Sequence, residues 1–372
     1  MMVKVNLKKV IGFCVAIVAL GLVIYTNIQN QKALHNTGKK NVYAVLPMSG
    51  AFTEYVKVVQ ETIRLWQQDH PNAPFQITYI DSASNPSKTV STIHQMASDE
   101  KNPLFITSMS LINSAILPVV ERLDGFNFAI TMTSIKPEFK NPHFQKISHS
   151  GEDELYPILK FAKRYKRLAL FYTNEEFGLY SEKIMAKNLK DTSSELVSVI
   201  PVELSSLNNR IEVLKALSKK PDAVLILGLP TMGMLNIIRE LRVQEYKGSI
   251  IVSSSFVHDY IVKAMGKDME NIVAPFIDLK QLDPHFHQKL SDKNININFS
   301  TAELWDVLDI INYTIKHNLP FNQETYTRMG KWKGVAGDVV FPGNGDSLYP
   351  FILVQYINGQ FVPVKEKEKT DE

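Results

Sequence analysis

Residues 42–55, VYAVLPMSGAFTEY, decide the fold class of this chain. Their apolar run breaks at Pro47 and at the Ser49-Gly50 turn, and apolar side chains then recur at helical spacing from Phe52 to Trp66. A buried strand, a small-residue turn and a helix start form the first β-α unit of a doubly wound sheet. Ligands of such sheets bind beyond the carboxyl ends of the strands, so residues 48–55 are predicted to face a ligand.

The same strand-helix rhythm repeats as far as Met265. Strands are predicted at 42–46, 75–80, 104–107, 126–132, 167–172, 196–202, 222–227 and 249–252. Helices are predicted at 53–69, 86–98, 111–123, 152–165, 179–190, 208–218, 231–244 and 257–265. Asn85 before Pro86 marks a helix start, because Asn caps free N–H groups and Pro needs no hydrogen bond in the first turn. Strands alternating with such helices indicate an α/β fold with parallel sheets covered on both faces.

The last third of the chain breaks this rhythm and argues against a closed barrel of β-α units. Residues 272–277 form a strand pattern, and a strong helix follows in which Ser300 and Glu303 are spaced as a capping box. Asn344-Gly345 suits a tight hairpin turn because both residues tolerate positive φ. A late antiparallel hairpin favours two doubly wound lobes, with the chain crossing between them more than once.

Length, composition and charge describe an ordinary globular protein. The 372 residues suffice for about two domains, and a content of 45% hydrophobic and 21% charged residues shows no bias toward disorder. The net charge of +3 is too small, and too evenly spread, to indicate nucleic-acid binding.

No motif in the sequence supports catalysis, so the chain is expected not to be an enzyme. The sequence has no G-x-S-x-G elbow, no phosphate-binding loop and no H-E-x-x-H zinc motif. His285 and His287 could place two imidazoles on one side of a strand, but no Cys or carboxylate cluster accompanies them. No metal and no cofactor are therefore expected.

The N-terminus is predicted to carry an export signal. Lys4, Lys8 and Lys9 precede an uncharged apolar run, and this order keeps the first end in the cytoplasm and exports the rest. Residues 10–27 are interpreted as an uncleaved signal anchor, a transmembrane helix in the inner membrane, with a cleaved signal peptide as the alternative.

The remaining terminal segments follow from that interpretation. Residues 1–9 are predicted to be a cytoplasmic basic tip, 28–40 a polar linker and 363–372 a charged, solvated tail. Cys14 is the single cysteine, so no disulfide can form within the chain. It is interpreted as an apolar residue of the anchor.

Several short motifs resemble, in their order and spacing, those of a known family. Leu46-Pro47-Met48-Ser49-Gly50 resembles an opening P-x-[ST]-G, and residues 334–346 resemble a G-x-x-G-x-x-x-F-x-x-x-G-D hairpin. Further landmarks are Asp81, Asn85-Pro86 and residues 107–110, 136–139, 172–178 and 221–224. Together they resemble type I periplasmic solute-binding proteins of the branched-chain amino acid and amide branch, over residues 42–362.

The resemblance implies two Rossmann-like lobes joined by three crossover strands, with a ligand closing the cleft between them. It assigns residues 41–147 and 276–330 to lobe 1, and residues 148–275 and 331–362 to lobe 2. It also implies a periplasmic location and an ABC permease as partner.

The clearest candidate site residues are Ser108, Met109 and Ser110, which lie between a strand and a helix. Free N–H groups at a helix start and two hydroxyls suit a carboxylate or another small polar group. The alternative is that Ser110 only caps the helix. Thr133 and Ser134 end the next strand and allow the same two interpretations.

In the amino-acid-binding members of the family, hydroxyls and N–H groups hold the ligand carboxylate, while an acidic residue and a Thr hold its ammonium. Here the acidic position falls in Ser253-Ser254-Ser255-Phe256, and the Thr position falls at or beside Ile135. A buried ammonium without a counter-charge costs several kcal/mol, so an ordinary α-amino acid is disfavoured as the ligand.

An apolar or aromatic-lined cleft is predicted instead. Its candidate lining residues are Tyr43, Phe52, Tyr55, Phe177, Tyr180, Leu229, Met232 and Phe256. Tyr43, Phe52 and Leu229 suit a plain core equally well. Met48 and Ser255 complete the predicted ligand-binding set.

Two functions remain open at this point. The first is a membrane-tethered or secreted solute-binding protein that delivers a small polar or partly aromatic ligand to an ABC permease. The second keeps the fold but makes it an anchored envelope sensor or regulatory module, which binds a protein partner or a signalling ligand.

Overall fold

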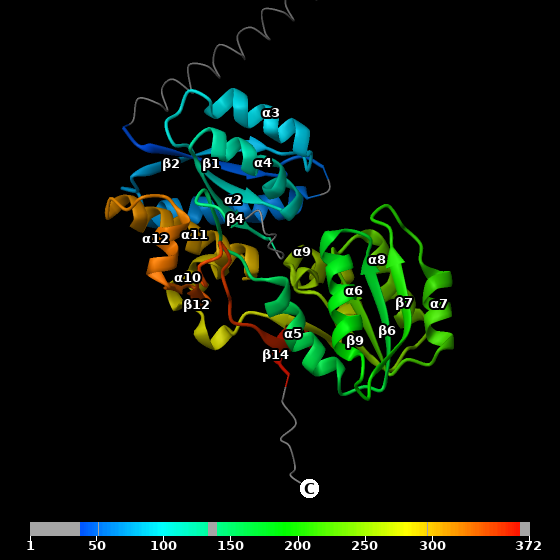
Figure 1. Cartoon of the computed structure of the whole chain (residues 1–372). Helices are drawn as coiled ribbons and strands as arrows, with labels where there is room; N and C mark the ends of the chain where they lie inside the picture. Colours follow the sequence, from blue (N-terminus) through cyan, green and yellow to red (C-terminus); the bar gives the residue numbers. More distant parts are fainter. Residues whose placement is uncertain (1–37, 51, 133–139, 296, 365–372) are drawn as a thin grey trace, which may run out of the picture.

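The computed structural model describes residues 38–50, 52–132, 140–295 and 297–364, and these form two lobes joined by extended segments (Figure 1). In that part of the chain, no helix is both long enough and apolar enough to cross a membrane. The anchor predicted at residues 10–27 lies outside the described residues, as do Thr133 and Ser134.

Lobe 1 is built on a five-stranded parallel sheet. Its strands, in spatial order, are β2 (Phe75–Asp81), β1 (Lys40–Leu46), β3 (Leu104–Ser108), β4 (Phe126–Ile130) and β5 (Phe144–Lys146). The helices that alternate with these strands are α2 (Thr53–Asp69), α3 (Pro86–Ala97) and α4 (Ser110–Arg122). β1 is almost wholly buried, as expected of a strand in a sheet covered on both faces.

Lobe 2 is built on a seven-stranded mixed sheet. Its strands, in spatial order, are β14 (Gln360–Pro363), β13 (Ile352–Ile357), β10 (Ile272–Phe276), β9 (Ser249–Val252), β8 (Ala223–Leu227), β6 (Arg167–Thr173) and β7 (Glu195–Val202). Its helices are α5 (Gly151–Ala162), α6 (Glu176–Leu189), α7 (Arg210–Ser218), α8 (Met232–Val243) and α9 (Asp259–Met265). In this sheet the β10–β13 and β13–β14 pairs are antiparallel, and the other pairs are parallel.

After β10 the chain returns to lobe 1 through three further helices. They are α10 (Pro284–Ser291), α11 (Phe299–Lys316) and α12 (Gln323–Met329). α11 packs lengthwise on α2 and is buried on nearly all sides. Trp66 of α2 donates a hydrogen bond from Nε1 to Asp309 of α11 at 2.7 Å, so a polar contact supplements the apolar packing.

The local sequence signals placed the elements of the first two thirds of the chain well. All strands predicted between residues 42 and 252 form, with ends within two residues of the prediction. The predicted helix start is also confirmed, because the side chain of Asn85 accepts a hydrogen bond from the backbone N–H of Lys88 and Pro86 is the first helical residue.

Two predicted local features of the last third are wrong. The capping box of α11 pairs Asn298 with Thr301 rather than Ser300 with Glu303, because the helix begins at Phe299 and Glu303 points inward. Asn344-Gly345 follows the β11–β12 hairpin instead of turning it. The same dipeptide at Asn358-Gly359 turns β13 into β14, with positive φ at both residues.

The segment that follows residue 330 also differs from its expected place in lobe 2. Strands β11 (Lys331–Gly334) and β12 (Gly337–Val340) form a separate two-stranded sheet. This hairpin bonds to lobe 1, because the N–H of Val335 donates to Asp306 of α11. The segment after the hairpin does so too, because the N–H of Lys146 donates to the carbonyl oxygen of Gly345. The chain joins the lobe-2 sheet only at β13, so the third crossing lies beyond Ser347.

Candidate functional site

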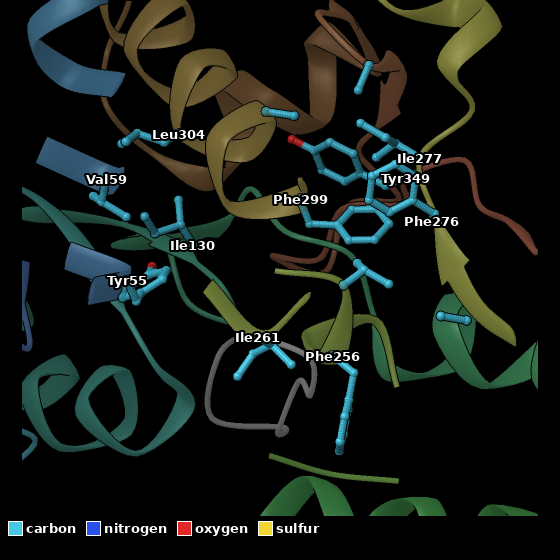
Figure 2. Close-up of a cluster of buried hydrophobic side chains, with 14 of the residues drawn as sticks. Tyr55, Val59, Ile130, Phe256, Ile261, Phe276, Ile277, Phe299, Leu304 and Tyr349 are labelled. Carbon is cyan, nitrogen blue, oxygen red and sulfur yellow. The ribbon is translucent and has the colours of Figure 1, made fainter. Parts of the chain in front are cut away.

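Three crossover segments connect the lobes, at residues 147–150, 277–278 and 347–351. Figure 2 shows Phe276, Phe299 and Tyr349 grouped beside them, with Tyr55 and Ile130 on the lobe-1 side. One continuous buried apolar cluster includes all five of these side chains and extends into the core of lobe 2. Side chains of both lobes therefore pack together at the crossover segments. These segments fix how the carboxyl ends of the strands in one sheet face those in the other.

The opening turn of the chain is held by Asp81, at the carboxyl end of β2. Its carboxylate accepts hydrogen bonds from the backbone N–H groups of Met48, Ser49 and Ala83 and from the Ser49 hydroxyl. Burial alone would raise the pKa of Asp81, but these four hydrogen bonds outweigh it and lower the pKa. Met48 and Phe52 are thereby fixed as half-buried side chains at this edge of lobe 1.

Ser108, Met109 and Ser110 lie where β3 passes into α4, as predicted. Ser108 is fully buried, and its hydroxyl has no hydrogen bond of acceptable geometry. Met109 has a positive φ of 76°, and this turns the chain sharply into the helix. Ser110 is the first helical residue, and the residue before it makes no side-chain cap, so a routine Ser110 cap is not what the structure contains.

A buried amide network supports this turn from below. The Thr107 hydroxyl donates to the Asn127 side chain at 2.8 Å, and the Asn127 amide donates to Asn113 at 2.7 Å. Asn113 in turn donates to the carbonyl oxygens of Thr107 and Met109. The network is complete within lobe 1, so it fixes the strained Met109 backbone independently of any ligand.

We expect Asn113→Ala to lower the free energy of unfolding by about 1–3 kcal/mol, because it leaves the buried Asn127 amide without its acceptor. Urea denaturation followed by circular dichroism measures the change. Asn188→Ala is the matched control, since the Asn188 amide bonds to a carbonyl oxygen on an exposed helix surface. Its effect should stay within about 0.5 kcal/mol. Equal losses for the two variants would contradict a supporting role for Asn113.

Tyr55 brings an aromatic ring and a hydroxyl to the same place. It projects from the first turn of α2, and its hydroxyl lies 3.3 Å from the Thr131 hydroxyl. Burial raises the pKa of the Tyr55 phenol, and the nearby hydroxyls of Ser108, Thr131 and Ser300 oppose that rise. These hydroxyls form a polar group within an otherwise apolar surrounding.

Lobe 2 meets this group through His258 and Tyr260. The ring of Tyr55 lies edge-on to the ring of His258, with centroids 6.3 Å apart, and His258 stacks on Tyr260 at 5.7 Å. Desolvation and the neighbouring His149 lower the pKa of His258, so its imidazole is neutral at pH 7. Neither His258 nor Tyr260 was singled out from the sequence.

The carboxyl edge of lobe 2 is crowded around Thr173. Its hydroxyl donates to Glu175 and accepts the backbone N–H of Leu229. Glu175 also caps α6 by accepting the N–H groups of Phe177 and Gly178. Leu229 and Phe177 are thus placed by one hydrogen-bonded cluster.

The other predicted lobe-2 residues divide between edge and core. The Ser255 hydroxyl donates to the carbonyl oxygen of Gly228 at 2.9 Å, at the end of β8. Phe256 is fully buried among lobe-2 core side chains, and Phe177 is buried in a second lobe-2 cluster. Tyr43 is core in lobe 1. These three rings serve packing in this arrangement.

Sequence reasoning missed the most polar feature of the region, a buried acid–imidazole–acid cluster formed by Glu303, His149 and Glu154. His149 Nδ1 lies 2.7 Å from Glu303, and its Nε2 lies 3.2 Å from Glu154. The Glu154 carboxylate also accepts the backbone N–H of Ser254 at 2.7 Å. The spacing of Ser300 and Glu303 predicts a helix cap, and no local pattern marks a contact between residues as distant in the chain as Glu303 and His149.

Among the described residues, no cluster of His, Cys, Asp and Glu side chains is arranged to hold a metal ion. A pocket of about 720 Å³ does occur in lobe 1, at the opposite, amino edge of the sheet. Its lining includes Lys40, Asp124 and His143, and none of the predicted site residues.

A sequence model of the family described as "Periplasmic binding protein" matches residues 42–293. A search of curated protein sequences returns no significant match.

Solved structures share the fold. A solute binding protein of an ABC transporter from Rhodopseudomonas palustris, solved with 3,4-dihydroxybenzoic acid, is 16% identical with a TM-score of 0.75, covering 88% of this chain and 96% of that one. A leucine binding protein from Thermotoga maritima is 15% identical with a TM-score of 0.73, covering 88% and 98%. An extracellular ligand binding receptor from Desulfohalobium retbaense is 17% identical with a TM-score of 0.73, and the match covers 88% of this chain but only 60% of that longer chain.

Proposed function

Because the chain belongs to the periplasmic binding protein family, we propose that it binds a small solute between its two lobes and closes them on it. The family match over residues 42–293 confirms the resemblance noted from the sequence, to the type I proteins that serve ABC transporters for leucine and other branched-chain amino acids. Members of this family are binding proteins rather than enzymes, which agrees with the lack of catalytic motifs.

The proposed ligand is a small carboxylate with an apolar or aromatic body. This proposal rests on the Ser108 hydroxyl at the N-terminus of α4, which is fully buried and, although it lies near the Tyr55 phenol, has no hydrogen bond of acceptable geometry. A buried hydroxyl without a well-formed hydrogen bond costs free energy that a ligand oxygen would recover. The helix N-terminus adds free N–H groups and a favourable dipole for an anion.

The surrounding rings favour an aromatic or apolar body for this ligand. Tyr55, His258 and Tyr260 bring three rings together where the lobes meet. Aromatic side chains can stack on an aromatic group of a ligand or contact it edge-on, and they can also cover an apolar group. The structural neighbour solved with 3,4-dihydroxybenzoic acid supplies a suitable first probe.

An ordinary α-amino acid is disfavoured by the charges already present. The loop expected to carry an acidic residue has Ser254 instead, and the carboxylate beside it, Glu154, is occupied by His149. The other buried carboxylate, Glu303, accepts four hydrogen bonds from its own chain. No carboxylate of this cluster is therefore left to pair with a ligand ammonium.

A thermal-shift panel of benzoate, 3,4-dihydroxybenzoate, phenylacetate and leucine tests this function on the purified chain. An acid that binds the folded state raises the melting temperature by mass action, and leucine should not. Ser108→Ala should then weaken binding of the acid by about tenfold, the loss of one hydrogen bond to a charged group. Ser114→Ala, on the same helix but bonded to Ser110, is the matched control. Binding of leucine in preference to the acids would refute the proposed ligand class.

The role after binding is also a proposal. Delivery to an ABC permease in the inner membrane fits the family, and an extracytoplasmic location follows from it. Fractionation of cells, with the mass of the mature N-terminus, will decide between the anchor predicted at residues 10–27 and a cleaved signal peptide. Loss of solute uptake on deletion of this chain would support delivery.

The alternative, binding of a protein partner in a sensing role, has one observation in its favour. Large apolar side chains are exposed around α7 and the start of α8 in lobe 2: Leu204, Leu207, Ile211, Leu214 and Met232. Exposed apolar groups of this size commonly mark protein contacts. Either a permease or an envelope protein could cover these side chains. A cross-link from Ile211, followed by identification of the cross-linked protein, therefore separates transport from sensing.

A further inference from the structure

A continuous buried chain of hydrogen bonds runs from one lobe to the other through a single imidazole. In lobe 1, the backbone N–H of Thr131 donates to Glu303 at 2.9 Å. Glu303 contacts Nδ1 of His149 at 2.7 Å, and Nε2 of His149 contacts Glu154 of lobe 2 at 3.2 Å. The N–H of Ser254 completes the chain by donating to Glu154 at 2.7 Å.

The two ends of this chain lie in the loops predicted to carry ligand contacts. Thr131 follows β4 and lies beside Tyr55 in lobe 1. Ser254 follows β9 and precedes Ser255 in lobe 2. His149 itself lies in the first crossover segment, two residues before α5, so the side chain that touches both carboxylates is at a hinge between the lobes.

Water is excluded from the imidazole on most sides. The rings of Phe299 and Phe351 lie 4.8 Å and 5.1 Å from it, and they stack on each other. The other charged group in contact is Lys146 of β5, whose Nζ donates to the carbonyl oxygen of His149. Lys146 is paired in turn with Asp346, in the segment after β12, at 2.5 Å.

His258 of lobe 2 is neutral and so does not compete for the two carboxylates. Tyr55, Asp306 and Tyr349 lie near Glu303 on its lobe-1 side. Burial would lower the pKa of His149, but the hydrogen bonds and charges of Glu154 and Glu303 outweigh it and raise the pKa to about 9. At pH 7 the cluster therefore contains an imidazolium between two acids.

We propose that His149 is a positioning residue, whose imidazolium joins the ligand-facing loops of the two lobes and holds one relative arrangement of them. This deepens the proposed function, since it concerns the same interlobe site. The imidazolium lies between the carboxylates of Glu154 and Glu303, where a ligand ammonium would otherwise bind. The protein thus carries its own cation at the site, in keeping with a ligand that brings a carboxylate but no ammonium.

The sign of the pH effect follows from the raised pKa. The imidazolium favours the joined arrangement fully below pH 6.5, the ordinary pKa of histidine, and this contribution is lost as the pH rises through about 9. The two lobes should therefore separate or become more mobile at high pH, although both remain folded.

Pulsed electron paramagnetic resonance on the full chain tests this without any ligand. Spin labels are placed by Lys57→Cys in lobe 1 and Lys187→Cys in lobe 2, with Cys14→Ser as background. The labelled protein should show one narrow distance population at pH 7 and a broader or longer one above pH 9. His149→Ala should be broad already at pH 6, and millimolar imidazole, which is charged there, should restore the narrow population.

His143→Ala is the matched control, because this histidine bonds to the carbonyl oxygen of Gly125 within lobe 1 and touches neither carboxylate. It should leave the distance population and its pH dependence unchanged. If His149→Ala does not fold, His149→Gln and the pH titration of the wild-type distances replace it.

An unchanged narrow population in His149→Ala or His149→Gln, or in wild type above pH 9, would overturn the proposal. So would broadening in the variant that imidazole does not reverse and that His143→Ala shares. The outcome is independent of the ligand panel, because a chain that binds none of the probes can still show the imidazole-dependent distance change. Conversely, acid binding with pH-independent distances would leave the proposed function standing and remove only the role of His149.

Discussion

Glu303→Ala is expected to lower the free energy of unfolding by about 3–5 kcal/mol. The fully buried carboxylate accepts hydrogen bonds from Thr131, Ser148 and both the backbone and the ring of His149. Its removal leaves the imidazolium and three other donors without this partner in a site closed to water.

Urea denaturation at pH 7 measures this loss, and a surface ion pair provides the control. Glu324→Ala removes an exposed carboxylate that pairs with Arg328 on α12, and it should cost no more than about 1 kcal/mol. Glu303→Gln should fall between the two, since it keeps the volume but presents amide donors to existing donors. Similar stability for Glu303→Ala and Glu324→Ala would contradict the buried cluster.

Gly178→Ala is expected to destabilise lobe 2 by about 3 kcal/mol. A Cβ at this position in α6 would overlap the carbonyl oxygen of Thr173 and lie only 2.9 Å from the backbone nitrogen of the same residue. Backbone atoms at the end of a central strand cannot move aside cheaply. Because the Thr173 hydroxyl also accepts the N–H of Leu229, the substitution should disturb the ligand-facing edge of lobe 2 as well.

Gly359→Ala is the control for Gly178→Ala. It lies in the β13–β14 turn with φ of +84° and nothing near its missing Cβ, so it should cost about 1 kcal/mol from backbone strain alone. Thermal unfolding monitored by calorimetry compares the two variants. If Gly178→Ala is as stable as Gly359→Ala, the backbone at the end of β6 can move aside more easily than its packing indicates.

Local signals explain why much of the fold could be predicted. Strand and helix periods, together with the Asn85-Pro86 helix start, depend on neighbouring residues, and the observed elements agree with them. Ser108 was found for the same reason, because a strand end followed by a helix start is visible in the sequence. Its missing hydrogen bond, however, depends on how the hydroxyls of Tyr55 and Thr131 are placed, and no sequence pattern records that.

The features that were missed join residues far apart in the chain. Glu303 meets His149 across 154 positions, and its spacing from Ser300 imitates a capping box that Asn298 and Thr301 form instead. The family resemblance assigns the β11–β12 hairpin to lobe 2. The structure places it on lobe 1, because lobe membership depends on contacts between distant residues, such as Val335 with Asp306. Periodicity predicts which face of an element is buried, but not which lobe buries it.

The structure of a complex is the most direct test of a carboxylate ligand held at the start of α4. A crystal of the chain grown with the acid that gives the largest thermal shift should place a carboxylate oxygen about 3 Å from the Ser108 hydroxyl, between Tyr55 and His258. No ligand cation should contact Glu154 or Glu303 in that complex. An acid bound instead in the lobe-1 pocket lined by Lys40 and His143, with the Ser108 hydroxyl still unpaired, would contradict it.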